Sequence, residues 1–161
     1  MTLNDTNAQR TVSLWNDTAP DAVNFTVGDS DYVNGNTYTY IAYCWAPKQG
    51  YSKFGGYTGN GNADGTFVYL GFRPAFVMTK SIDSTSSWHM FDNKREGYNV
   101  DNDALVASAS TAEATTDMID ILSNGFKCRI ATDPNVAETY VYAAFAEAPF
   151  VNSNGVPCNA R

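Results

Sequence analysis

Short runs of alternating aromatic and small residues, separated by turns rich in Gly, Asn, Asp and Pro, extend along most of the 161-residue chain. An alternation with a period of two places successive side chains on opposite faces of a strand, whereas a helix needs a period near 3.6. Aromatic residues make up 14% of the chain, and they suit the half-buried face of a pleated sheet better than a helix. The pattern therefore predicts an all-β protein.

The predicted strands are short. One hairpin is especially clear, because Asn124 and Gly125 supply the positive φ angles of a tight turn between two apolar runs, 118–122 and 126–130. The stretch 103–116 has poor apolar spacing for a helix, and we expect a loop with at most one or two helical turns. Strands are expected to be centred near Tyr40, Tyr69, Val77, Trp88, Ile121, Cys128 and Tyr142.

Residues 37–47 are similar to residues 139–149, and six of the eleven aligned positions are identical. Each copy is preceded by a strand-like stretch, so the chain is predicted to contain two strand-loop-strand units, near 25–47 and 126–149. The alternative is that two Tyr-rich strands converged by composition. We expect one β-sandwich domain over residues 1–161, jelly-roll or concanavalin-like, in which the two copies occupy equivalent places.

The charge balance argues against several classes of partner. Ten basic and seventeen acidic residues give a net charge of 10 − 17 = −7, and no run of Lys or Arg forms a footprint for phosphates. The first residues show neither the basic nor the apolar region of a signal peptide, and no stretch reaches the 18 or so apolar residues of a membrane span. We therefore expect no nucleic-acid partner, no membrane insertion and synthesis as a soluble protein.

Three cysteines, Cys44, Cys128 and Cys158, occur without a C-x-x-C pair, which argues against a disulfide framework and against a zinc site. Cys44 and Cys128 are predicted to be small, buried strand residues. The thiols are accordingly not expected to be needed for folding.

Catalytic patterns are weak in this sequence. The one histidine, His89, lies in a predicted strand, and no Ser or Cys lies in a G-x-S-x-G context. The loop 60–65 resembles the first half of a calcium loop, but position twelve is Gly71 where a closing Glu is needed. We predict no enzyme, cofactor or metal. The carboxylates that could still serve a glycosidase lie mostly in polar turns: Asp92, Asp101, Asp103, Glu113 and Asp120.

Aromatic side chains are the candidate binding groups. A flat ring with an apolar body and a polar rim can stack on a sugar, although core packing explains aromatic residues in strands equally well. Trp15 and Tyr57 lie in loop-like contexts and are the first choices, followed by Trp45 and Trp88.

A set of short motifs covers nearly the whole chain, from Trp15 to the C-terminal end, and includes Gly55-Gly56-Tyr57-Thr58-Gly59, Gly71-Phe72-Arg73-Pro74, Ser123-Asn124-Gly125-Phe126-Lys127 and Tyr142-Ala143-Ala144-Phe145-Ala146. Together these motifs resemble a β-rich domain of uncharacterised chemistry that recurs in tail-fibre-like and other virion proteins of marine tailed phages, including cyanophages. That domain often lies at the C-terminus of long chains that also contain concanavalin-like sandwich domains. It carries no established catalytic residues.

The resemblance implies a virion structural protein, assembled in the bacterial cytoplasm and displayed on the particle as a head-decorating knob or a tail-fibre module for host contact. Its partners would be other capsid or tail proteins, and we expect a homo-oligomer with apolar contacts around Tyr51, Phe54, Phe150 and Val151. The first alternative is a carbohydrate-binding module for host surface glycans. A glycan-degrading tail enzyme is the second.

Overall fold

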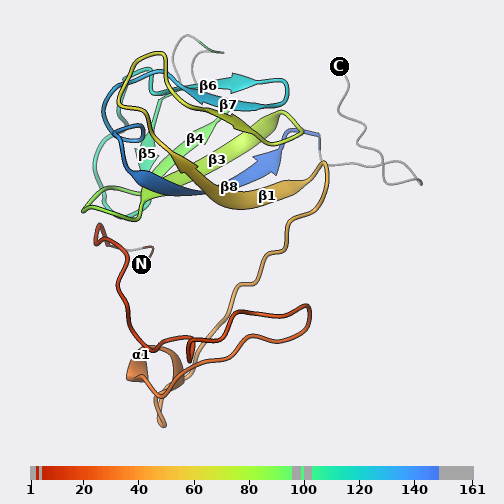
Figure 1. Ribbon diagram of the computed structural model, residues 1–161, viewed down its shortest axis with the longest axis vertical. Coiled ribbons are helices and arrows are strands. Elements are labelled where there is room, and N and C mark those ends of the chain that lie inside the picture. The colour runs from red at the N-terminus through yellow and green to blue at the C-terminus, as the bar shows by residue number, and fades with distance from the viewer. Residues whose placement is uncertain (1–2, 4, 96–98, 100–102, 149–161) are drawn as a thin grey trace. The chain divides into compact units, whose positions relative to one another are not determined.

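The computed structural model describes residues 3, 5–95, 99 and 103–148. The chain divides into two compact units, one formed by Met1–Gln9 together with Ala46–Arg161 and the other by Arg10–Trp45. We call them the larger and the smaller unit. All strands belong to the larger unit and the single described α-helix belongs to the smaller one (Figure 1).

The larger unit consists of two open antiparallel sheets, an arrangement consistent with a β-sandwich. The five-stranded sheet has the order β1-β8-β3-β4-β5, and the three-stranded sheet has the order β2-β7-β6 (Figure 1). The strands are β1 (Ser52–Thr58), β2 (Phe67–Tyr69), β3 (Pro74–Ser81), β4 (His89–Asp92), β5 (Leu105–Val106), β6 (Ile119–Leu122), β7 (Gly125–Cys128) and β8 (Thr139–Ala146).

The last strand of the chain lies inside the larger sheet. β8 pairs with β1 on one side and with β3 on the other, so that Tyr140 is opposite Tyr57 and Tyr142 is opposite Thr79. β6 and β7 form the hairpin that the Asn-Gly turn predicts. Strands near Tyr69, Val77, Ile121, Cys128 and Tyr142 are confirmed, and Trp88 lies one residue before β4.

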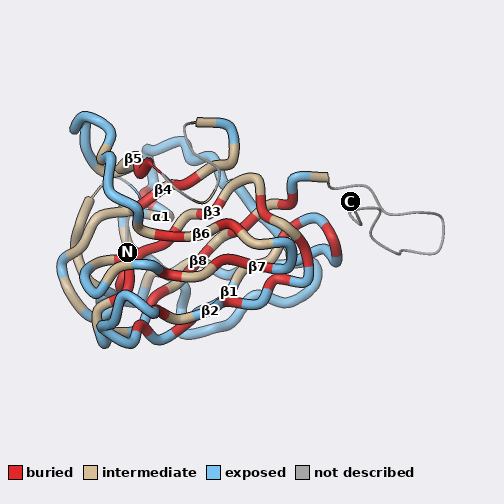
Figure 2. The backbone as a smooth tube through the Cα atoms, turned by 90° about the horizontal axis from the view of Figure 1, so that it is seen from above, coloured by how far each residue is buried: buried red, intermediate tan, exposed pale blue. Residues whose placement is uncertain are grey.

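The core of the larger unit is formed by alternate side chains of both sheets. Val77, Phe91 and Tyr140 come from the five-stranded sheet, Phe126 and Ile119 come from the three-stranded sheet, and each of them is fully buried. Buried and partly exposed residues alternate along β8 and β6, as Figure 2 shows for these strands. This period of two is the strand signal of the sequence.

The buried Asn135 fixes the loop 59–66 that follows β1. Its Nδ2 donates to Asn60 Oδ1 at 2.9 Å and to the carbonyl oxygens of Asn62 and Ile130 at 2.8 Å each. Its Oδ1 accepts from the backbone N–H of Asn60 at 3.2 Å. Within the loop, the Asn60 and Asn62 side-chain oxygens accept from the backbone N–H groups of Asn62 and Asp64. The side-chain oxygens at 60 and 62, which suggested a calcium loop, are thus used in local hydrogen bonds.

The smaller unit contains α1 (Asp31–Asn34), whose N-terminus is capped by Ser30. The Tyr40 hydroxyl donates a hydrogen bond to the carbonyl of Asp31 and accepts one from the N–H of Gly35. The strand predicted near Tyr40 is wrong, because residues 37–46 form no strand. Tyr38, Ile41 and Tyr43 are 65%, 78% and 74% exposed. Alternation alone cannot make a strand, because the ladder hydrogen bonds must come from a neighbouring strand.

The proposed internal duplication is therefore not seen in the structure. The second copy forms β8, which lies between β1 and β3, whereas residues 37–45 of the first copy lie in the smaller unit without strand pairing. Cys44 is correspondingly exposed rather than buried, while Cys128 is fully buried as predicted. Burial raises the pKa of the Cys128 thiol to about 11, and both thiols are free. Cys158 lies outside the described residues.

The loop predicted over 103–116 contains only the two-residue strand β5 and an isolated bridge between Ala104 and Ala114. In the described part of the chain, we find no helix with the length and apolar character that crossing a bilayer requires.

Candidate functional site

The outer face of the five-stranded sheet is apolar. Val77, Tyr140 and Phe91 point into the core, so the residues between them in sequence point to the opposite face. The strand register places this second set side by side across β1, β8, β3, β4 and β5. We call it the outer face, and its apolar members are Phe54, Phe145, Ala143, Val141, Phe76, Met78, Met90 and Leu105.

Phe145 is the centre of an aromatic cluster on the outer face. The ring centroid of Phe54 lies 5.7 Å from that of Phe145 at an interplanar angle of 82°, and Phe76 lies at 6.3 Å on the other side. Tyr51, just before β1, also meets Phe145 edge to face at 6.3 Å and is 47% exposed. The Phe and Met side chains of the face are partly exposed. A sheet face open to water is normally polar, so this face has the composition of a contact surface.

Opposite charges lie at the two ends of this sheet. The first end is the one at which β1 and β3 start and β4 and β8 finish. There the Arg73 guanidinium is 3.0 Å from the Glu147 carboxylate, and the Lys94 ammonium is 3.7 Å from the same carboxylate. The described charges at this end sum to 5 − 4 = +1 and are Lys48, Lys53, Arg73, Lys94 and Arg95 against Asp92, Asp103, Glu113 and Glu147.

The other end of the sheet is acidic. Glu138 accepts hydrogen bonds from Ser81 and Ser84 at 2.6 and 2.7 Å, and Asp83 accepts from the N–H of Thr139 at 2.6 Å. Burial lowers the pKa of Lys80 there, although neighbouring carboxylates oppose that shift. The described charges at this end sum to 1 − 4 = −3 and are Lys80 against Asp5, Asp83, Asp133 and Glu138.

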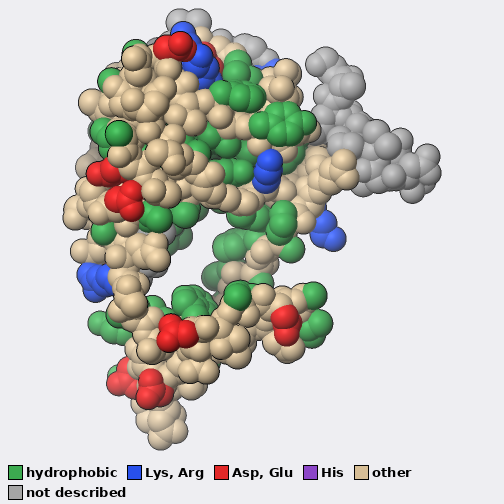
Figure 3. All heavy atoms as spheres, in the orientation of Figure 1, with side chains coloured by type: hydrophobic (Ala, Val, Ile, Leu, Met, Phe, Trp, Pro, Cys, Tyr) green, Lys and Arg blue, Asp and Glu red, His purple; other side chains and the backbone are tan. Residues whose placement is uncertain are grey.

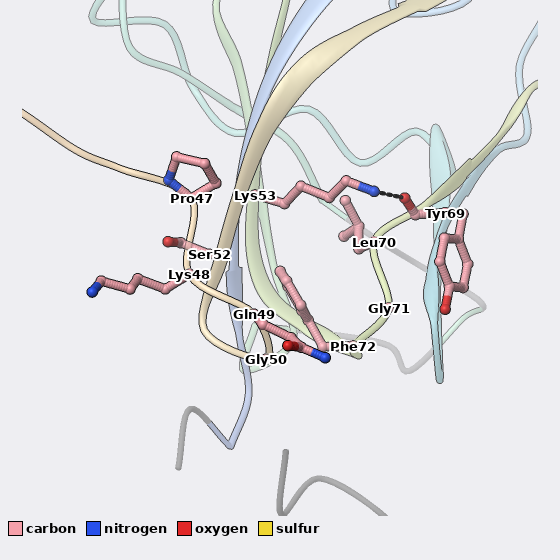
Figure 4. Close-up of a pocket in the computed structure, with 10 residues that line it drawn as sticks. All are labelled: Pro47, Lys48, Gln49, Gly50, Ser52, Lys53, Tyr69, Leu70, Gly71 and Phe72. Atoms are coloured by element: carbon pink, nitrogen blue, oxygen red, sulfur yellow. Dashed lines mark hydrogen bonds between the residues drawn. The ribbon is translucent and has the colours of Figure 1, made fainter. Parts of the chain in front are cut away.

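A depression of about 360 Å³ opens beside the basic end, between the start of β1 and the segment after β2 (Figure 4). The Lys53 ammonium spans it and donates to the carbonyl of Tyr69 at 2.7 Å, while Leu70 and Phe72 contribute apolar lining. Lys53, the cation that spans the depression, is thus already bound to a backbone carbonyl, and the Lys48 side chain extends away from it (Figure 4).

A buried polar cluster lies at the acidic end, inside the sandwich. His89 Nδ1 lies 3.9 Å from Asp133 Oδ2, and its ring stacks on Phe91 with centroids 6.3 Å apart. Burial lowers the pKa of His89, and the negative charge of Asp133 only partly opposes this effect. Burial also raises the pKa of Tyr140 in this cluster. His89 is therefore neutral at pH 7, and the cluster is as buried as the core.

Two of the four predicted binding residues are exposed. Trp15 is 54% exposed and meets Phe25 edge to face, and Trp45 is 66% exposed and stacks on Tyr43 with centroids 6.1 Å apart. Both belong to the smaller unit, where hydrophobic side chains lie open on the surface among acidic ones (Figure 3). These residues could still meet a sugar or another apolar partner.

Tyr57 and Trp88 belong to the larger unit. Tyr57 is only 8% exposed, its ring stacks on Tyr140 at 5.0 Å, and its hydroxyl donates to the carbonyl of Pro134 at 2.7 Å. This burial, which also raises the pKa of the phenol, makes Tyr57 a core residue that offers little ring surface to a sugar. Gly55 and Gly56 look loop-like in the sequence but lie within β1, where Gly55 leaves room for the ring of Tyr142. Trp88 is partly buried.

Ion pairs hold several of the candidate carboxylates. Burial opposes ionisation of Asp92, but hydrogen bonds from the Arg95 side chain and from the backbone of Lys94 and Arg95 lower its pKa. Arg95 also contacts Glu113, and Asp120 lies 3.2 Å from Arg129. Asp103 is buried, and Asp101 lies outside the described residues.

The apolar contact predicted around Tyr51 and Phe54 coincides with one edge of the outer face, whereas Phe150 and Val151 lie outside the described residues. The sequence did not identify Phe76, Met78 and Met90 as part of the same surface. The sequence does contain a signal for this surface. One predicted strand is apolar on both of its faces, through Ala75, Phe76, Val77 and Met78. Apolar side chains on both faces of a strand indicate that both faces are covered.

The fold and the surface together define a class: an open, two-sheet antiparallel β protein with an apolar, partly exposed sheet face. Comparison of sequences then gives the family. The chain belongs to the family described as Domain of unknown function (DUF7483), whose model matches residues 1–149. No curated protein and no solved structure matches the chain.

Proposed function

We propose that this protein is a non-enzymatic surface module of a tailed-phage particle that acts by binding, as a head-decorating knob or as a tail-fibre module for host contact. The phage setting comes from the sequence resemblance described above. The binding function is supported by the outer face, since an apolar sheet face of this size favours contact with another protein surface. Free cysteines fit assembly in the reducing cytoplasm of the host.

Within this proposal the larger unit is a sandwich of jelly-roll or concanavalin-like type, and its partners are capsid or tail proteins together with other copies of itself. Repetition on a particle gives avidity without strong single contacts, which suits a protein with few free charges. The test is to incubate the purified, labelled chain with particles from which it has been stripped. Saturable rebinding to capsids or tails supports the proposal, and failure to bind either contradicts it.

A second candidate function is carbohydrate binding by the smaller unit. The observation that favours it is the exposure of Trp15 and Trp45, each beside a second aromatic ring. Exposed indole rings can stack on the apolar face of a sugar. Glycan-array binding that is lost in Trp15→Ala or Trp45→Ala, but is kept in Tyr32→Ala, would support this function, since Tyr32 is 86% exposed and stacks on no other ring among the described residues.

A further inference from the structure

The outer face is more apolar than a sheet face that is exposed to solvent in a monomer normally is. Phe145 and Phe76 pair in register on β8 and β3, their rings are in contact, and the Phe54 ring packs on Phe145 from β1. The next row in register crosses four strands and consists of Phe54, Ala143, Met78 and Met90. Two such rows create a flat apolar area, and flat sheet faces pack well on other sheet faces.

The area is large enough for a specific contact. β3 and β8 have eight residues each, so the face is about 25 Å long at roughly 3.3 Å per residue. Four strands at a spacing of about 4.8 Å give a width of about 15–20 Å. Covering this face with an equal one removes on the order of 1,000 Å² from water in total, which reaches the lower limit for a specific protein interface.

The charges select the partner and its orientation. The described residues at one end of the face carry a net charge of +1, and those at the other end carry −3. A second copy that lies face to face with its strands reversed brings each basic end opposite an acidic end. This arrangement has a two-fold axis that runs between the sheets, perpendicular to the strands, and such isologous contacts are the usual basis of dimers. The opposite orientation would place like charges together.

From these observations we propose that two copies of the chain pair through the outer faces of their five-stranded sheets, with reversed strand directions, Met78 and Ala143 near the two-fold axis and Arg73 and Lys94 of one copy facing the acidic end of the other. The inference deepens the binding function proposed above by naming a second copy as the partner of this face. Its test needs neither particle nor host, so either proposal can fail alone.

The first experiment is sedimentation equilibrium of the full chain, with reductant present so that Cys44 forms no cross-link. The expected result is a reversible dimer with a dissociation constant near the micromolar range, since an interface of about 1,000 Å² is modest. Met78→Glu places a charge in the centre of the contact and should weaken the dimer at least about 100-fold. The matched control is Phe67→Glu, which lies on the other sheet and is 43% exposed, and which should leave the dimer intact.

Far-UV circular dichroism shows whether each variant is folded. Phe76→Ser is a second, milder variant of the face, and it should weaken the dimer as well. A wild-type chain that stays monomeric at about 200 μM overturns the inference, because that concentration is about two hundred times a dissociation constant of about 1 μM. A dimer that survives both Met78→Glu and Phe76→Ser overturns it too.

Two further measurements test the orientation. Raising salt from about 50 to 500 mM should weaken the dimer about tenfold or more, because screening removes the attraction between opposite ends. With Cys44 and Cys158 replaced by Ser, Ala143→Cys should cross-link to itself through a thiol reagent of about 10 Å span, the usual separation of packed sheets. Thr139→Cys, at the acidic end of β8, should not. Self-cross-linking at 139, or a dimer strengthened by salt, contradicts the reversed arrangement.

Discussion

Replacing Tyr57 separates its role as a core residue from its predicted role in ligand binding. Its hydroxyl donates to the carbonyl of Pro134 at 2.7 Å, and both groups are buried. Tyr57→Phe leaves that carbonyl without this donor, and an unsatisfied buried polar group costs about 1–2 kcal/mol. Tyr57→Ala also removes the ring.

The ring of Tyr57 makes three aromatic contacts, with Tyr140 at 5.0 Å, Phe126 at 5.8 Å and Tyr142 at 6.5 Å. Removal of a buried aromatic ring costs about 3–5 kcal/mol, which is a large part of the roughly 5–15 kcal/mol that stabilises a domain. We therefore expect Tyr57→Ala to lower the melting temperature by about 10–20 °C, at about 4 °C per kcal/mol for a unit of this size.

The assay is urea unfolding followed by far-UV circular dichroism, which reports on the sheets. Tyr69→Ala is the matched control, because this ring is 60% exposed and its removal should change the free energy of unfolding by at most about 0.5 kcal/mol. A loss below about 1 kcal/mol for Tyr57→Ala, combined with loss of glycan binding, would show that the packing argument is wrong and that Tyr57 serves a ligand.

Three further predictions concern buried groups and thiols. Because burial lowers the pKa of His89 below 6.5 in the folded state, its contribution to stability is complete above pH 6.5 and is lost as the pH falls from there through the folded-state pKa. His89→Gln should flatten urea midpoints over that pH window, and a wild-type midpoint that does not change between pH 7.5 and 5 contradicts the assignment. Asn135→Ala should cost about 3 kcal/mol, since several buried or backbone partners lose their hydrogen bonds, and a cost below about 1 kcal/mol would show that loop 59–66 does not depend on Asn135. The melting temperature should be the same with and without reductant, because both described thiols are free; a sharp drop on reduction would reveal a disulfide.

Local patterns allowed most strands of the larger unit to be predicted. Asn124 and Gly125 mark the turn of a hairpin by their backbone preferences alone, and β3 begins at Pro74 with the apolar stretch 75–78. These signals are read within a few residues of sequence. They need no information on which strand lies beside which.

The errors arose where the outcome depended on a distant neighbour. Residues 37–46 and 139–146 have nearly the same alternation, but only the second segment lies between two other strands. Tyr57 resembles a loop aromatic because glycines flank it, and its burial follows from pairing with Tyr140, 83 positions later. The outer face was missed for the same reason, since the strand order alone brings Phe54, Phe76 and Phe145 together.

The measurement that tests the proposed function most directly is electron microscopy, at subunit resolution, of the phage particle on which we propose that this chain is displayed. The account predicts density for the two-sheet unit in several copies on the outside of the capsid or the tail, with the outer face of the five-stranded sheet covered by a protein surface. Particles that lack the chain altogether, or copies in which that face is open to solvent at every position, would contradict it.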